Sequence, residues 1–197
     1  NNEFEITIAS VVGNESRVNE ELCFSEEIAS DNYDYMVDQI LQIMFANCPG
    51  ITVVKGLYSE KYIKIGNFGL LMAHGTTMGF SPEKAVYSKI AKYSQEGKTV
   101  DYIIFGHIHS AYCSDMFARG GSLCGGNGYS DNGLNLLSRA SQNLIIVDTV
   151  NKNRDTIKVD LQDVSDITDN YPIEKYLEEY APKTLNSNVR VIIENII

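Results

Sequence analysis

Tryptophan is absent from this chain of 197 residues, and proline, cysteine and histidine are scarce, with four, four and three copies. No apolar run approaches the roughly 20 residues that cross a bilayer, and the first residues, NNEFEITIAS, lack the basic and apolar parts of a signal peptide. Lys and Arg are not clustered, and the net charge is −10. These absences exclude a spanning helix and disfavour a broad nucleic-acid face. We expect a cytoplasmic protein that does not contact the membrane, in the host cytoplasm if the chain is viral.

The four cysteines also lack any spacing typical of a metal or redox motif. No C-x-x-C pair occurs among Cys23, Cys48, Cys113 and Cys124. Scattered reduced thiols of this kind are usual in cytosolic proteins. The cysteines therefore predict neither a zinc finger nor a disulfide framework.

The hydrophobic pattern alternates between strand-like and helix-like segments. Strands are predicted near residues 4–14, 49–56, 62–75, 99–109, 142–150 and 155–164, the third of these as a hairpin that turns at Gly66-Asn67. A helix is predicted around 32–48, with its Met and Tyr side chains in the core, and another over 81–96, with Ser81 as the N-cap. Residues 115–133 read as a long loop, and a short helix is expected near 174–180. This order favours an α/β sandwich with mixed sheets flanked by helices.

Three predicted strands end on polar side chains of one chemical kind. Asn14 follows SVVG, His74 follows LLMA, and His107 and His109 follow IIFG. Ligands of open α/β sheets bind beyond the carboxyl ends of strands, so these side chains are expected to converge. If residues 107–109 are extended, both imidazoles lie on the same face. Each histidine alone is an ordinary hydrogen-bonding residue, but together the set suits Zn, Mn, Fe or Ni.

The segments VVGNESR, LLMAHGTT and FGHIHS resemble the last three signature blocks of the calcineurin-like metallophosphoesterases. The resemblance covers roughly residues 6–150, and the glycine-rich stretch after 120 is also similar to phage-encoded members. It implies an αββα sandwich of the metallo-dependent phosphatase type, here its C-terminal part, over residues 1–165, with a C-terminal extension over 166–197. It also implies two divalent ions, with Asn14, His74 and His107 on the second and His109 on the first. The implied reaction is phosphoester hydrolysis by a hydroxide that two metal ions activate.

The chain departs from the family pattern in two places. The family's upstream blocks, D-x-H and G-D-x-x-D, are absent, and the chain does not begin with Met. We therefore expect the N-terminal half of the domain, cleaved, encoded separately or not included, as a partner that completes the site. The family's histidine after the asparagine is Glu15 here, which is a general acid only if its pKa is raised. The alternative for Glu15 is an ion pair with Arg17, and Arg17 is a candidate contact for substrate phosphate.

The glycine-rich segment 120–133 lacks the Lys-Ser/Thr ending of a phosphate-binding P-loop. It follows the histidine pair, so it is expected to border the substrate cleft. Asn127, Tyr129 and Arg139 are candidate substrate-binding residues, against the alternative of a plain surface loop.

Several functions remain open on this reading. The leading prediction is a phosphodiesterase, with nucleic acid as one candidate substrate, and a phosphomonoesterase is the nearest alternative. A second class is a non-catalytic scaffold subunit with a degenerate site. A third is a single structural zinc held by the three histidines. A homo-oligomer is compatible with each of these functions.

Overall fold

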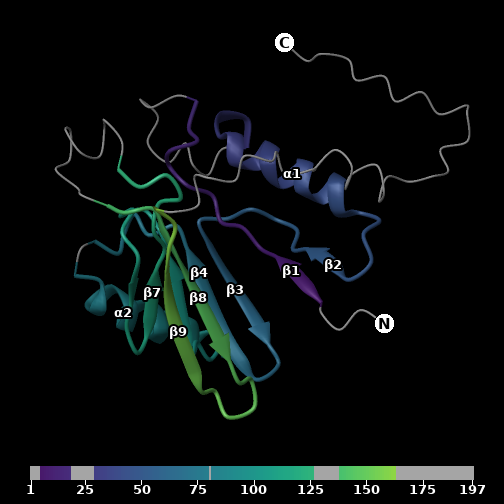
Figure 1. Ribbon diagram of the computed structural model, residues 1–197. Helices are drawn as coiled ribbons and strands as arrows, with labels where there is room; N and C mark the ends of the chain where they lie inside the picture. Colours follow the sequence, from purple (N-terminus) through teal and green to yellow (C-terminus); the bar gives the residue numbers. More distant parts are fainter. Residues whose placement is uncertain (1–4, 19–28, 80, 127–137, 163–197) are drawn as a thin grey trace, which may run out of the picture.

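The structure is a computed structural model that describes residues 5–18, 29–79, 81–126 and 138–162. Its centre is a five-stranded mixed sheet (Figure 1). Across the sheet the strands are β3 (Glu60–Ile65), β4 (Phe68–Ala73), β5 (Tyr102–Phe105), β7 (Phe117–Arg119) and β6 (Tyr112–Cys113). β3 and β4 form the predicted hairpin around Gly66-Asn67, and β4, β5 and β7 run parallel. The prediction of a mixed α/β fold with flanking helices is confirmed.

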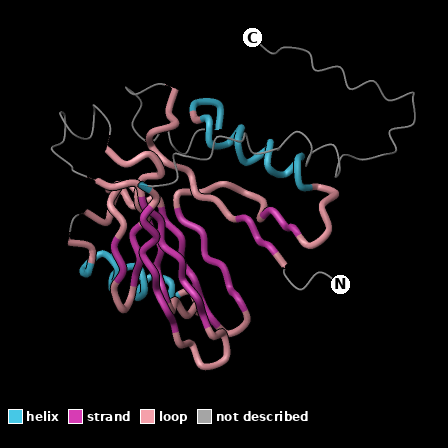
Figure 2. Tube along the Cα trace, in the orientation of Figure 1, coloured by secondary structure: helices cyan, strands magenta, loops and turns pink. Residues whose placement is uncertain are grey.

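Side chains alternate between the two faces of this sheet, and each face is covered. On one face helix α2 (Glu83–Gln95) contributes Val86 and Tyr93, which pack with Leu71 and Ile103. On the other face lies the antiparallel hairpin of β8 (Ser141–Val147) and β9 (Arg154–Asp160). There Phe68 and Tyr102 are packed by Ile145 and Val147. Figure 2 shows α2 and the hairpin strands with the sheet between them.

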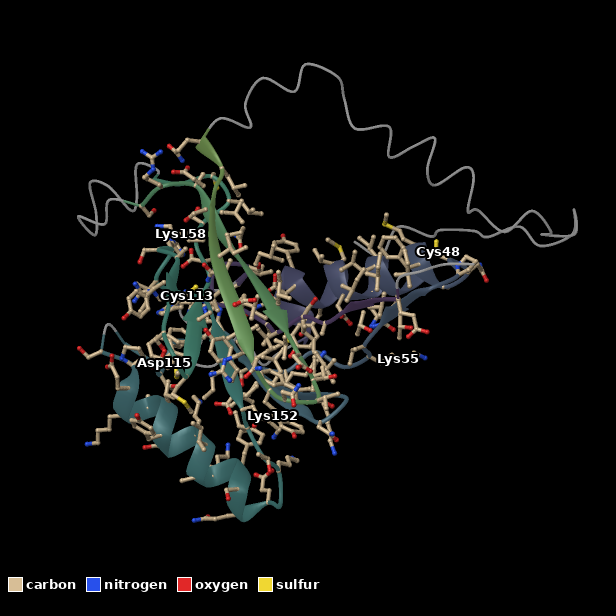
Figure 3. The ribbon with its side chains drawn as sticks, turned by 60° about the horizontal axis from the view of Figure 1, so that its bottom comes forward. Cys48, Lys55, Cys113, Asp115, Lys152 and Lys158 are labelled. Carbon is tan, nitrogen blue, oxygen red and sulfur yellow. The ribbon has the colours of Figure 1, made fainter. Side chains whose placement is uncertain are left out.

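A second, smaller unit lies to one side of the sheet. β1 (Ile6–Ile8) and β2 (Ile51–Val53) form a two-stranded parallel sheet, and α1 (Tyr33–Phe45) connects them. A short 3₁₀ helix, η2 (Ala29–Asp31), precedes α1. A backbone hydrogen bond, in which Val12 N–H donates to Tyr58 O, joins this unit to the segment that leads into β3. Figure 1 shows α1 and β2 away from α2, and in Figure 3 Cys48 and Lys55 lie apart from Asp115 in the same way.

The exposure of α1 is the reverse of what an amphipathic helix on a core shows. Its buried residue is Asp38, which accepts a hydrogen bond from Gln42. Asp38 also lies near buried Lys61 of β3, whose pKa is lowered by burial, an effect that the Asp38 charge opposes. The apolar side chains on the outer side are instead half-exposed or more: Tyr33, Met36, Val37, Ile40 and Ile43. The prediction that the Met and Tyr residues of this helix are core is therefore wrong for Tyr33 and Met36.

Several predicted boundaries also differ from the structure. β1 and β2 have three residues each, shorter than the predicted strands 4–14 and 49–56, and in the described part of the chain each pairs with one strand only. The segment 115–133 is not a plain loop, since Phe117 and Ala118 are buried and form β7. The N-cap position of α2 is held by Pro82 without a side-chain cap, so Ser81 does not cap it. The short helix expected at 174–180 lies outside the described residues.

Neither helix in the described ranges has the length and apolarity required to cross a membrane.

Candidate metal centre

The structure brings Asn14, His74 and His107 together from three distant parts of the chain. Asn14 Oδ1 lies 2.5 Å from His74 Nε2 and 3.0 Å from His107 Nδ1. The two imidazoles are edge to face, with His107 Nδ1 3.2 Å from His74 Nε2. His74 follows β4 and His107 follows β5, whose parallel pairing places the two carboxyl ends side by side. The sequence prediction that these strand ends meet agrees with this geometry.

The three converging atoms form an arrangement that suits a cation. Asn14 Oδ1 is only an acceptor, and His74 Nε2 faces both this oxygen and the Asn14 N–H, at 3.4 Å. If Nε2 accepts a hydrogen bond from that N–H, its lone pair also faces the lone pairs of the Asn14 carboxamide oxygen. A cation bound to both atoms would remove the repulsion between them. Metal–ligand bonds of about 2.1 Å set neighbouring octahedral ligands about 3.0 Å apart. The separations of 3.0 and 3.2 Å from His107 Nδ1 are close to that spacing, whereas the 2.5 Å between Asn14 Oδ1 and His74 Nε2 is shorter than it. One carboxamide oxygen and two imidazole nitrogens are donor types that borderline divalent ions take.

His109 is not part of this contact. His107 and His109 have φ of 71° and 61°, so the segment is not extended and the two-residue alternation does not apply. Among the described residues no three His, Cys, Asp or Glu side chains are grouped to hold a metal ion. The alternative of one structural zinc held by the three histidines is therefore wrong. The Asn14 carboxamide is the third side chain in contact with His74 and His107.

The positive φ at His107 and His109 shows how closely the backbone turns after β5. Left-handed backbone is unusual for residues with a side chain and concentrates at functional sites. Gly75, with φ of 114°, lies against this turn, and an added Cβ there would sit 2.9 Å from Gly106 O. Glycine at position 75 therefore allows the two strand ends to approach each other.

Glu15 is exposed and accepts a hydrogen bond from Asn14 Nδ2 at 3.0 Å. This contact turns Asn14 Oδ1 toward the histidines, because the amide nitrogen is engaged on the other side. Glu15 and Arg17 form no ion pair, unlike the alternative expected from sequence. Arg17 Nε is instead buried and has no hydrogen-bond partner in the described part of the chain.

Of the three predicted substrate contacts, Arg139 is the one that lies in the described residues. Arg139 is ion-paired with Asp160 of β9, with Nη2 2.9 Å from the carboxylate. Asn127 and Tyr129 lie outside the described residues.

Sequence reasoning missed the residues that support the Asn14 loop. Asn32 is the N-cap of α1 and is 3% exposed, and Asp34 lies in the first helical turn. Asn32 Nδ2 donates to Gly13 O, and Gly13 N–H donates to Asp34 Oδ2, both at 2.7 Å. The pattern Asn32-Tyr33-Asp34 before an apolar helix gives a helix-start signal, but nothing in the sequence shows that the same side chains reach back to Gly13.

No protein-family profile matches the chain, and no curated protein matches it. Among solved structures, Vps29 from Entamoeba histolytica in complex with zinc is 22% identical, with a TM-score of 0.40, over 56% of this chain and 69% of that one. Vps29 from Chaetomium thermophilum is 15% identical, with a TM-score of 0.41, over 76% and 94%. An archaeal phosphodiesterase is 15% identical, with a TM-score of 0.36, over 66% and 64%. Each similarity is one of fold, at low identity.

Proposed function

We propose that this chain is the C-terminal part of a metal-dependent phosphoesterase that hydrolyses phosphodiester bonds. The observation that supports it most is the convergence of His74 and His107, at the ends of the neighbouring strands β4 and β5, with Asn14 from the loop that follows β1. A carboxamide oxygen and two imidazole nitrogens form a donor set for a borderline divalent ion such as Mn, Fe, Zn or Ni. His109 is proposed to hold a second ion, two residues further along the same turn.

In this proposal the metal ions supply Lewis-acid activation of water and neutralise charge on phosphate oxygens. The chain's own residues orient the substrate and hold protons. Arg17 offers a buried Nε without a partner, and a phosphate oxygen is a suitable acceptor for it. In the proposal Glu15, which is exposed and accepts a hydrogen bond from the Asn14 amide, takes the general-acid role that the resemblance gives to a histidine.

Completion of the centre by an N-terminal half of the domain is part of the proposal. Two features of the β1–β2–α1 unit support it. Parallel sheets are almost always buried on both faces. In the described part of the chain the parallel sheet of β1 and β2 has two strands only. The outer side of α1 is apolar and half-exposed, and a hollow of about 680 Å³ lies between its C-terminal half and β2. Further strands and a helix beside β1 and α1 would bury these surfaces and bring more ligands to Asn14.

The test uses the full-length protein, together with the N-terminal half that the proposal calls for. We expect close to two Mn, Fe or Zn ions per chain and hydrolysis of bis-p-nitrophenyl phosphate with Mn²⁺. His107→Ala should lower this activity at least 100-fold and remove one ion, because it deletes a metal ligand. Tyr87→Ser, an exposed change on α2, is the matched control and should leave both unchanged. A full-length protein that hydrolyses neither diester nor monoester would refute the enzymatic proposal.

A non-catalytic scaffold is the second candidate. It is favoured by Glu15, which stands where the resemblance calls for a histidine, and by a centre of two histidines and one asparagine in the described residues. A scaffold predicts no metal in the purified full-length protein and no change in partner binding when His107 is replaced by alanine. Activity on p-nitrophenyl phosphate without activity on the diester would indicate the phosphomonoesterase alternative.

A further inference from the structure

Side chains at the N-terminus of α1 hydrogen-bond to the loop that carries Asn14. Gly13 is held on both sides of its backbone, since its N–H donates to Asp34 Oδ2 and its C=O accepts from Asn32 Nδ2, each at 2.7 Å. Asp34 Oδ1 accepts a second hydrogen bond, from Ser16 Oγ at 2.7 Å. One carboxylate therefore bonds to the residue before Asn14 and to the residue two positions after it.

The same two side chains also build the start of the helix. Asn32 Oδ1 accepts from Asp34 N–H at 2.9 Å, which is the N-cap hydrogen bond of α1. Asp34 lies in the first turn of α1, where a carboxylate interacts favourably with the helix dipole and its oxygens accept hydrogen bonds. Backbone hydrogen bonds from Tyr33 N–H to Ser16 O and from Val18 N–H to Asp31 O complete the attachment. The loop over residues 13–18 is thus attached to the start of α1 by side-chain and backbone hydrogen bonds.

This attachment fixes the distance between Asn14 and the histidines. A Cβ on Gly13 would lie 3.0 Å from His74 Cε1 and 3.1 Å from its Nδ1, so the loop backbone already lies against the imidazole. A shift of a few tenths of an ångström would separate Asn14 Oδ1 from His74 Nε2 or push the backbone into the ring. Groups that orient a metal ligand without touching the metal commonly change metal affinity 10- to 100-fold when they are removed.

We propose that Asp34, with Asn32, is the positioning residue of the metal centre: it holds Asn14 against His74 and His107 through Gly13 and Ser16. This inference rests on the proposed function for its effect on metal binding. The hydrogen bonds from Asp34 and Asn32 to Gly13 do not depend on the presence of a metal.

Asp34→Asn is the sharpest test, because it keeps the side-chain shape while it places an amide N–H₂ against the Gly13 N–H or the Ser16 hydroxyl. In the full-length protein we expect at least tenfold faster hydrogen exchange of the Gly13 amide without metal. Titration with Co²⁺ should show at least tenfold weaker binding and altered visible absorption bands, since the carboxamide no longer reaches the ion. Ser16→Ala removes one of the two bonds to the carboxylate and should give smaller changes in the same direction. Asp155→Asn, exposed on β9, is the matched control and should change neither readout.

The outcomes separate this inference from the proposed function. Faster Gly13 exchange with unchanged Co²⁺ affinity and spectrum would overturn the positioning role, and unchanged exchange would show that Asp34 does not hold Gly13. If the wild-type protein takes up no Co²⁺, the proposed function fails, and Gly13 exchange alone decides whether Asp34 holds the loop. If Asp34→Asn does not fold, Ser16→Ala gives the same two readouts.

Discussion

The two sides of this molecule are packed in opposite ways. Where α2 meets the central sheet, apolar side chains face inward: Leu71 and Ile103 are fully buried and Phe105 is 2% exposed. Where α1 meets the sheet, the inward residue is Asp38, and apolar Ile43 is 75% exposed. On the first side the apolar side chains form a core that the described residues cover. The second has the composition of a core face, but among the described residues its apolar side chains stay exposed, and this is the surface that the proposed N-terminal half would cover.

Phe105→Ala is expected to produce the largest effect, because it removes a large side chain from the core on the α2 face. Phe105 stacks on Phe117 with ring centroids 5.5 Å apart and is packed by its neighbours on the α2 face. We expect the free energy of unfolding to fall by about 3–5 kcal/mol, as is usual for aromatic-to-alanine changes in a core. Urea denaturation followed by circular dichroism measures it. A loss below about 1.5 kcal/mol would mean that this side is less tightly packed than the structure indicates.

Alkaline pH should weaken the packing on both faces of the central sheet, with Tyr93 on the α2 face and Tyr102 on the β8–β9 face. Burial, followed by nearby Glu60, raises the pKa of Tyr93 to about 12, and burial raises that of Tyr102 to about 12. The folded protein then keeps phenolic protons that the unfolded chain releases near pH 10, so stability must fall between about pH 10 and 12. Urea midpoints measured across this range should decline in wild type and decline less in a Tyr93→Phe, Tyr102→Phe double variant. Equal slopes in both proteins would contradict the assignment.

The smallest effect is expected on the outer side of α1. Met36→Ser removes a side chain that is 53% exposed, so in the described chain it should change the free energy of unfolding by no more than about 0.5 kcal/mol. Asp38→Ala, on the inner side, should cost more, about 1–3 kcal/mol, because it leaves buried Lys61 without a nearby negative charge.

The order of these two variants should invert once the apolar side of α1 is covered. In the full-length protein Met36→Ser should cost more than Asp38→Ala if upstream strands pack there. Paired denaturation curves on the 197-residue chain and the full-length protein decide this. An unchanged order would argue against a covering layer.

The sequence was informative where one local pattern specified one structure. The hairpin at Gly66-Asn67, the helix over 33–45 and the pair β8–β9 follow from periodicity and turn chemistry, and they are present as predicted. The meeting of His74 and His107 follows from the ends of two parallel neighbouring strands, whereas Asn14 reaches them from a loop after β1, which belongs to another sheet.

What failed depends on contacts between distant residues. The orientation of α1 could not be predicted, because an apolar stripe indicates a partner and does not say which one. The left-handed backbone of His107 and His109 is set by the crowding after β5, so an H-x-H pattern alone suggests an extended segment. The hydrogen bond from Gly13 N–H to Asp34 Oδ2 joins residues 21 positions apart, and no local sequence pattern predicts it.

The backbone at His107 and His109 limits how this site can change in evolution. Positive φ is tolerated by glycine and, less easily, by asparagine or aspartate, and it strongly disfavours β-branched residues. A single substitution at either position therefore faces two separate demands, one from the chain's conformation and one from the chemistry of the side chain. Glycine or asparagine at 107 or 109 would keep the backbone conformation and remove the imidazole, so such variants separate the two demands.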